Sequence, residues 1–229
     1  MISVITCTNR PHMMKQIFKN YSSQKLKNKE LILILNNDTM DIKKWQKAAK
    51  KHPNVSVYQL PERLSVSECK NFAVKQSNYR YIAKFDDDDY YAPPYLTAVW
   101  KAFRSQKKAD IVGKGSIYVY FEKENCLGLL GSKAENGFTP RVADSTLAFK
   151  KDIFPYVRFT NMKVGSDKRF QMDARAKGFA IYSTNRYNHA AIRGANAHTW
   201  HIKDDQLMGI CTETIYTKDY KAIVTKFNR

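Results

Sequence analysis

YIAKFDDDDYYAPP (residues 81–94) joins a short apolar run to four consecutive aspartates, a tyrosine pair and a proline pair. A short apolar run that ends at polar and turn-forming residues predicts a buried β-strand. In open α/β sheets, ligands bind at the carboxyl ends of the strands. The stretch therefore predicts a sheet strand whose carboxyl end carries the acid run, Asp86–Asp89.

The residues before this strand alternate between strand-like and helix-like segments. The strand-like runs are ISVITC (2–7), LILILN (31–36) and VSVYQL (55–60), and helix-length segments separate them. This alternation predicts parallel strands joined by right-handed crossovers. Ser65-Val66-Ser67-Glu68 fits a capping box, so we expect the third helix to begin there. The loops after Cys7, Leu35 and Phe85 should then lie close together.

The residues after the acid run are less regular. We expect a helix over 95–105, strands over 111–113, 116–121 and 145–149, and a helix over 167–177. The predicted fold class is α/β, with a mixed, mostly parallel sheet flanked by helices. We expect a single domain over residues 1–229, divided by texture into a regular half (1–110) and a mixed half (111–229).

The composition narrows the class of protein. Lys and Arg exceed Asp and Glu by 18 charges, so the surface should attract anions such as nucleotides, acidic polymers or lipid headgroups. The four cysteines are widely spaced, which indicates neither a disulfide framework nor a zinc site. The sequence has no signal-peptide pattern and no apolar run near the ~18 residues of a membrane span. We expect a cytoplasmic protein, whose basic charge allows peripheral association with an anionic membrane, a polymer or a spore surface.

Four adjacent aspartates repel one another unless a cation or hydrogen-bond donors compensate their charge. Mg²⁺ and Mn²⁺ prefer carboxylate oxygens and complete their coordination shell with substrate phosphates and water. The acid run therefore predicts a divalent-metal site. A solvated acidic turn is the alternative, because charge runs are usually solvent-exposed.

Several other function classes lack their signatures. No G-x-G-x-x-G follows the first strand and no P-loop is present, which argues against a dinucleotide-binding dehydrogenase and a P-loop enzyme. No nucleic-acid-binding module accompanies the positive charge, so no specific nucleic-acid partner is expected. A sugar nucleotidyltransferase would carry a glycine-rich loop after the first strand, and TCTNRP (6–11) is not one.

The first part of the chain resembles the nucleotide-binding half of family 2 glycosyltransferases of the GT-A fold. The resemblance rests on four stretches in this order: ISVITCTNRP, ELILILNND, SECKNFAV and YIAKFDDDDYYAP. DSTLAFKKDIF (144–154) and GSDKRFQMDARAKGF (165–179) are similar to later segments of that family. FDDDDYY also resembles an element of some bacterial spore-surface glycosyltransferases. The resemblance implies a GT-A (Rossmann-like) fold, with residues 1–110 binding a nucleotide-sugar and 111–229 binding the acceptor.

The resemblance also implies roles for the acid run. Asp86 and Asp88 match the D-x-D motif, with Asp88 as the main ligand of Mn²⁺ or Mg²⁺. Asp87 or Asp86 would hold the ribose or an outer-shell water. Similar enzymes often place a late histidine near the metal, and His198 is the preferred candidate over His201. Both histidines could equally be ordinary packed or surface residues.

The residues that would hold the donor nucleotide are assigned in the same way. Thr6, Thr8 and Arg10 match the loop that holds the nucleobase, and Lys70 matches a contact to the base or ribose. Asn37 stands where the family usually has an aspartate, which leaves the base open.

Asp167 matches the catalytic base of the family. The resemblance implies an inverting, metal-dependent glycosyltransferase that moves a sugar from a nucleotide-diphosphate donor to an acceptor hydroxyl. Such a reaction would serve polysaccharide or glycoconjugate synthesis at the cell or spore surface. A plain helix-start carboxylate is the structural alternative for Asp167. A sugar nucleotidyltransferase and a non-catalytic nucleotide-binding pseudoenzyme of the same fold remain alternatives for the whole chain.

Overall fold

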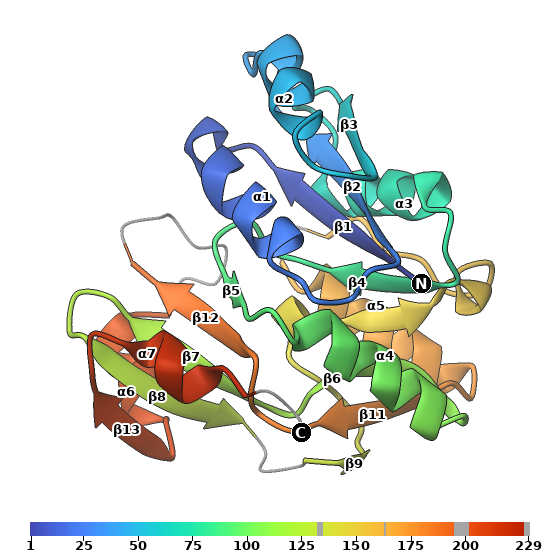
Figure 1. Cartoon of the computed structure of the whole chain (residues 1–229). Coiled ribbons are helices and arrows are strands. Elements are labelled where there is room, and N and C mark those ends of the chain that lie inside the picture. Colours follow the sequence, from blue (N-terminus) through green and yellow to red (C-terminus); the bar gives the residue numbers. More distant parts are fainter. Residues whose placement is uncertain (132–134, 163, 195–201, 227–229) are drawn as a thin grey trace.

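The computed structural model describes residues 1–131, 135–162, 164–194 and 202–226, and Figure 1 shows their arrangement. The described strands form an eight-stranded sheet and a five-stranded sheet. The larger sheet carries helices on both faces, and the smaller sheet lies to one side of it (Figure 1). The acid run connects a strand of the first sheet to a strand of the second.

The larger sheet has the strand order β3-β2-β1-β4-β10-β6-β11-β9. Its strands are β1 (Ile2–Thr8), β2 (Lys29–Leu35), β3 (Val55–Gln59), β4 (Tyr81–Lys84), β6 (Ala109–Lys114), β9 (Gly137–Phe138), β10 (Ala148–Lys150) and β11 (Ala180–Thr184). Strands β3, β2, β1 and β4 pair in parallel, as do β6 and β11. Strand β10 inserts antiparallel between β4 and β6, and β9 pairs antiparallel with β11.

Helices cover both faces of this sheet. The α-helices of the chain are α1 (Met14–Ser22), α2 (Ile42–Ala49), α3 (Val66–Gln76), α4 (Tyr95–Ser105), α5 (Ser166–Ala176), α6 (Asp204–Gly209) and α7 (Tyr220–Val224). The described residues also form three short 3-10 helices, which are η1 (Pro11–Met13), η2 (Asp144–Thr146) and η3 (Lys151–Ile153). Helices α1, α2 and α4 supply one core cluster, and α3 and α5 supply the other.

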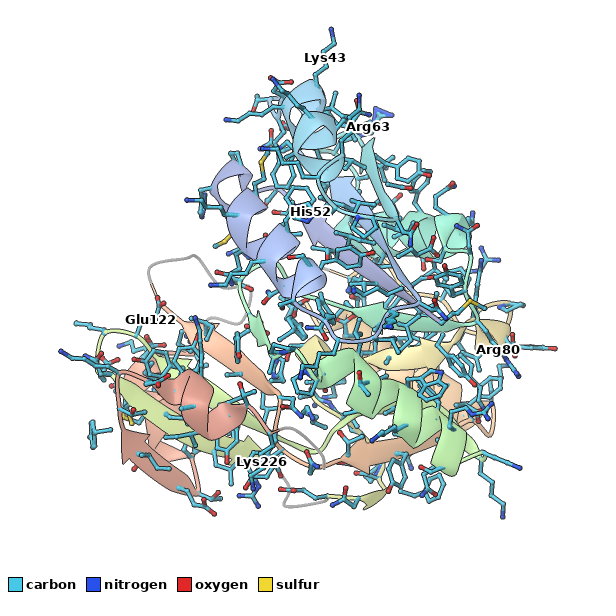
Figure 2. All side chains as sticks on the ribbon, viewed as in Figure 1. Lys43, His52, Arg63, Arg80, Glu122 and Lys226 are labelled. Atoms are coloured by element: carbon cyan, nitrogen blue, oxygen red, sulfur yellow. The ribbon has the colours of Figure 1, made fainter. Side chains whose placement is uncertain are left out.

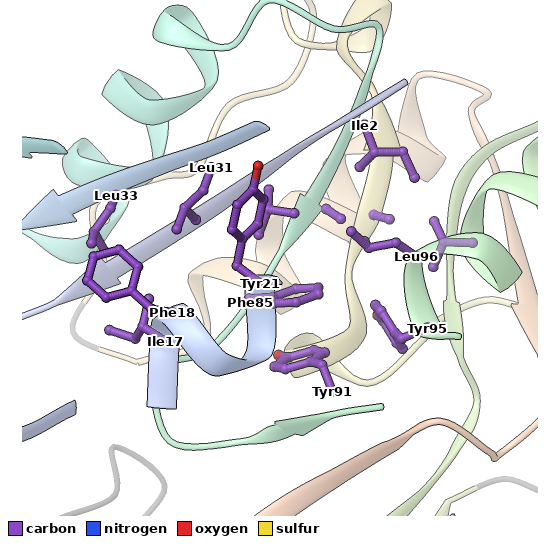
Figure 3. Packing of buried hydrophobic residues seen from close by; sticks show 14 of the residues in the cluster. Ile2, Ile17, Phe18, Tyr21, Leu31, Leu33, Phe85, Tyr91, Tyr95 and Leu96 are labelled. Carbon is purple, nitrogen blue, oxygen red and sulfur yellow. The ribbon is translucent and has the colours of Figure 1, made fainter. Parts of the chain in front are cut away.

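The side chains of β2 show how the two cores form. Leu31 and Leu33 point into the first cluster, beside Phe18 and Tyr21 of α1 (Figure 3), whereas Ile32 points into the second. A strand that is buried on both faces reads as a continuous apolar run, which is the pattern of LILIL. Charged side chains such as Lys43 of α2 and Arg80 project from the outside of this assembly (Figure 2).

The smaller sheet has the strand order β13-β8-β7-β12-β5. Its strands are β5 (Tyr90–Tyr91), β7 (Ser116–Phe121), β8 (Cys126–Gly131), β12 (His189–Arg193) and β13 (Glu213–Tyr216). The two predicted strands over 111–113 and 116–121 thus belong to different sheets, and Gly115 lies between them. This second sheet was not foreseen from the sequence.

The main sequence predictions agree with the structure. The α/β class with a mixed, mostly parallel sheet flanked by helices is confirmed, and Ser65 caps α3 with the predicted capping box. The expected strand over 145–149 is partly wrong. It begins only at Ala148, because a hydrogen bond from Thr146 N to Ala143 O closes a 3-10 turn before it. The division into two functional halves within one domain stays a prediction.

Among the described helices, none combines the length and apolar character that a membrane crossing requires.

Candidate active site

The acid run lies at the junction of the two sheets. Its entry is fixed by Phe85, whose backbone N–H donates to Ile5 O of β1 (3.0 Å) and whose ring stacks on Tyr91, with centroids 3.8 Å apart. Asp86 N donates to the Tyr91 hydroxyl (2.9 Å), and that hydroxyl donates to Ser145 O (2.7 Å). Figure 3 shows Phe85 and Tyr91 together in the core. The packed aromatic pair therefore sets the course of the acid run between β4 and β5.

The loop after β1 is tied to Asp87. The Thr8 hydroxyl donates to Asp87 (2.5 Å), and the Arg10 guanidinium donates to both carboxylate oxygens of Asp87 through Nε and a terminal nitrogen. A two-pronged arginine–carboxylate pair of this kind is strong and directional. Asp87 is buried beneath these contacts, at 6% exposure. Thr8 and Arg10, predicted to face the donor nucleotide, thus also hold the acid run against β1.

Asp88 lies among carboxylates of like charge, and its pKa is raised. It forms an ion pair with Arg10, in which a terminal guanidinium nitrogen lies 2.9 Å from Asp88 Oδ2. Burial, followed by the charges of Asp89 and Asp86, raises the pKa of Asp88 to about 6, although Arg10 acts in the opposite direction. An additional cation at Asp88 would relieve this repulsion.

The carboxylate of Asp89 contacts the smaller sheet. Its carboxylate accepts from Ile192 N (3.1 Å) and lies 3.4 Å from His189 Nε2 on β12. Burial, followed by the charge of Asp86, raises the pKa of Asp89 to about 7. Burial and the nearby ammonium of Lys114 lower the pKa of His189 to about 3, so this imidazole is neutral. Asp89 therefore connects the acid run to the smaller sheet.

Asp167 occupies the first turn of α5 and is held by two buried lysines. Lys70 Nζ lies 2.6 Å from Asp167 Oδ1, and Lys84 Nζ lies 3.3 Å from Oδ2. The same Lys84 ammonium lies 2.6 Å from Asp86 Oδ1. Burial opposes ionisation of Asp167, but Lys84 and Lys70 outweigh it and hold the pKa of Asp167 below its ordinary value. The carboxylate is ionised at neutral pH and linked to the acid run through Lys84.

The other predicted residues lie at varying distances from this centre. Thr6 is buried in β1, two residues before Thr8 and on the same face of the sheet. Asn37 follows β2, and its amide donates to Asn9 O (3.2 Å) in the first loop. The predicted meeting of the loops after β1, β2 and β4 is therefore confirmed. His198 lies outside the described residues.

The residues present fit a divalent-metal site in which a bound ligand would complete the coordination shell. Over the described parts of the chain, no three His, Cys, Asp or Glu side chains surround one point, so a cage built only from protein is absent there. Mg²⁺ and Mn²⁺ sites commonly use one or two carboxylates together with substrate phosphates and water. The carboxylates of Asp86 and Asp88, whose repulsion contributes to the raised pKa of Asp88, match that kind of site.

Sequence reasoning missed two buried lysines. Lys84 lies inside the apolar run YIAKF, and a lysine in a buried strand was the available signal. Lys114 ends β6 and donates to Asn185 O (2.7 Å) and to the Thr184 hydroxyl (3.2 Å). Burial lowers the pKa of Lys114 to about 7, against the opposing effect of Glu135. Lys114 is therefore a further titratable group at the junction of the sheets, besides Asp88 and Asp89.

Lys114 should make stability depend on pH above neutrality. Because its folded-state pKa is depressed from 10.5 to about 7, the unfolded chain binds more protons between these values. The free energy of unfolding should therefore rise with pH in this window, by up to about 1.4 kcal/mol per pH unit. Urea unfolding at several pH values should show this slope reduced in Lys114→Met. The exposed control Lys101→Met should keep the wild-type slope, and equal slopes in all three proteins would contradict the assignment.

Comparison with known proteins supplies the family context. The sequence model described as Glycosyl transferase family 2 matches residues 3–141. No curated protein sequence matches the chain significantly.

Among solved structures, S. aureus TarS 1-349 in complex with UDP-GlcNAc is similar with a TM-score of 0.68 and 17% sequence identity, over 88% of this chain and 61% of that one. TarS 1-349 in another crystal structure gives a TM-score of 0.64 at 18% identity, over 83% and 60%. A longer TarS structure gives 0.62 at 18% identity, over 84% and 36%. The chain thus spans less than two thirds of the TarS chain in each of these structures, and the likeness shows a GT-A fold.

Proposed function

We propose, from the premise that this chain belongs to glycosyl transferase family 2, that it transfers a sugar from a nucleotide-diphosphate donor to an acceptor hydroxyl. The observation that carries the proposal is the Lys84 ammonium, bonded at once to Asp86 of the acid run and to Asp167 of α5. It joins the carboxylates assigned to the leaving group and the carboxylate assigned to the acceptor. Both halves of a transfer reaction would therefore meet at one point.

The donor side would be formed by the loops after β1 and β2 together with α3. Thr8 and Arg10 lie beside the acid run, Asn37 borders the same loop, and Lys70 reaches the site from α3. TarS 1-349 has been crystallised with UDP-GlcNAc, which supports a nucleotide-sugar as the donor class. Because Asn37 replaces the usual aspartate, we leave the identity of the base to experiment.

Asp88 and Asp86 would hold Mn²⁺ or Mg²⁺. When bound, such an ion supplies a Lewis acid that neutralises charge growing on the diphosphate leaving group. The chain's own residues prepare this position. Arg10 pairs with Asp87 and Asp88, Lys84 pairs with Asp86, and the mutual repulsion of the aspartates, which helps to raise the pKa of Asp88, would favour a bound cation.

Asp167 would act as the general base. Its ionised carboxylate would accept the proton of the acceptor hydroxyl while that oxygen attacks the anomeric carbon from the face opposite the nucleotide. Attack from that face inverts the anomeric configuration. The two lysines keep the carboxylate deprotonated at neutral pH and fix its orientation.

The physiological setting is part of the same proposal. Synthesis of a surface polysaccharide or glycoconjugate suits the family, and the net charge of +18 suits an anionic acceptor or surface. A sugar nucleotidyltransferase would instead consume a nucleoside triphosphate and a sugar phosphate. A pseudoenzyme would bind the nucleotide-sugar without turnover.

A panel of nucleotide-sugars with uracil, guanine, cytosine and thymine bases tests the proposal. Each is incubated with the protein and Mn²⁺, and the released nucleoside diphosphate is measured with and without candidate acceptors. We expect one base to be preferred and release to need the divalent ion. Release of pyrophosphate from a nucleoside triphosphate and a sugar phosphate would favour the nucleotidyltransferase. Saturable binding without any release would favour the pseudoenzyme.

A further inference from the structure

Lys84 is a charged residue in a place where an apolar one would ordinarily stand. It belongs to β4, between Ala83 and Phe85, and only 7% of its side chain is exposed. Burial of an ammonium is costly unless carboxylates compensate it. Asp86 and Asp167 supply that compensation, because their carboxylate oxygens lie 2.6 Å and 3.3 Å from the Lys84 ammonium.

The two partners of Lys84 come from different parts of the chain. Asp86 lies two residues after it, just beyond the end of β4. Asp167 lies in the first turn of α5, which follows β10 in the chain. Lys70 binds Asp167 as well, but through the other oxygen, and its second bond goes to the Ser166 hydroxyl at 2.9 Å. Lys70 therefore anchors Asp167 to α3, and Lys84 anchors it to the acid run.

We propose that Lys84 is a positioning residue that couples the acid run to Asp167, by sharing one ammonium between the carboxylate of Asp86 and that of Asp167. The proposal rests on the function proposed above. Lys84 fixes the orientation of Asp167 through Oδ2 and keeps it ionised. It also competes with a divalent ion for Asp86, because a carboxylate oxygen bound to an ammonium is a weaker metal ligand.

This double role gives Lys84 a signature that a purely structural lysine lacks. Removing the ammonium frees Asp86, so the metal should bind more tightly. The same change takes one of two cations from Asp167, so its pKa should rise and transfer should slow. Tighter metal binding together with slower transfer distinguishes coupling from simple damage to the site, which would weaken both.

Lys84→Met, which keeps the length and removes the charge, is the test variant. Electron paramagnetic resonance should show Mn²⁺ bound at least about fivefold more tightly in the presence of a nucleoside diphosphate. Carbon-13 NMR of the Asp167 carboxyl should show its pKa raised by about one unit or more. The acid limb of the kcat–pH profile should move upward by a similar amount.

Lys70→Met is the matched control, since Lys70 also binds Asp167 and its second bond is to Ser166. We expect it to raise the pKa of Asp167 without the gain in Mn²⁺ affinity that Lys84→Met shows, because Lys70 does not bind Asp86. Lys84→Arg, which keeps the charge, should restore the wild-type Asp167 titration in part. Circular dichroism and thermal unfolding verify that each variant is folded.

Unchanged Mn²⁺ affinity and an unmoved Asp167 titration in folded Lys84→Met would overturn the proposal. Should the wild type bind no nucleoside diphosphate with Mn²⁺, the donor assignment would fail instead. The Asp167 titration needs no substrate, so it would still decide whether Lys84 couples the two carboxylates.

Discussion

Asparagine in place of Asp167 should remove sugar transfer and spare nucleotide binding. We expect kcat to fall about 10²- to 10⁴-fold, the usual contribution of a general base. The affinity for the preferred nucleoside diphosphate should stay within about threefold, because a base acting on the acceptor contributes little to binding of the leaving group. Single-turnover transfer and calorimetric binding measure the two effects separately.

Asp173→Asn is the matched control for this experiment. Asp173 lies on the same helix and forms an exposed ion pair with Arg169, four residues before it. Its loss should leave both transfer and binding unchanged. Since the pKa of Asp167 is lowered, any loss of transfer that comes from protonation of this base should appear below the ordinary pKa of an aspartate. Parallel loss of transfer and nucleotide affinity in Asp167→Asn would contradict its assignment as a base.

Alanine in place of Asp88 should abolish the metal dependence of nucleotide binding. In the wild type, Mn²⁺ should raise the affinity for the nucleoside diphosphate by about tenfold or more, because a divalent ion held by Asp88 would attract the diphosphate. In Asp88→Ala, titrations with Mn²⁺ and with a chelator should give nearly the same affinity. Isothermal titration calorimetry measures all four conditions.

Asp152→Asn is the control for Asp88, since Asp152 forms an exposed ion pair with Arg80. It should keep the full response to Mn²⁺. A wild-type response to Mn²⁺ in Asp88→Ala would move the metal away from the acid run, and the assignment of Asp88 as its ligand would be wrong.

The regular half of the fold was predictable because its signals are local. LILIL is apolar on both faces, which indicates a strand covered by helices on both sides, and Ser65 with Glu68 forms the predicted capping box. The order of elements then places the loops after β1, β2 and β4 at one edge. Parallel pairing of β1 and β4 was therefore enough to predict that the first loop meets the acid run. The hydrogen bond between Thr8 and Asp87 is such a contact.

The smaller sheet was not predictable in the same way. Strand β5 has only two residues, and its partner β12 lies about a hundred residues further along the chain. Such short strands are defined by their partners, and no periodicity in the sequence identifies those partners. The role of Asp89 depends on this sheet, because its carboxylate accepts from the backbone of Ile192. A sequence pattern could therefore place four aspartates together but could not assign them different partners.

The lysines of the site show the same limit. Lys70 was expected to contact the donor nucleotide, and its ion pair with Asp167, 97 residues away, was not foreseen. In the sequence, Lys84 is a charged residue in an apolar strand with no evident partner. The tertiary structure supplies the partner, because α5 places Asp167 beside it. Charge compensation between distant segments requires the tertiary structure, whereas the position of the acid run at a strand end does not.

The bridging of the acid run and the donor diphosphate by a divalent ion is the central claim, and calorimetry on the wild-type protein tests it most directly. The preferred nucleoside diphosphate is titrated into protein stripped with a chelator, and again after Mn²⁺ is restored. We predict weak binding without the ion and recovery of tight binding when the ion returns. Equally tight binding in the stripped protein would contradict it.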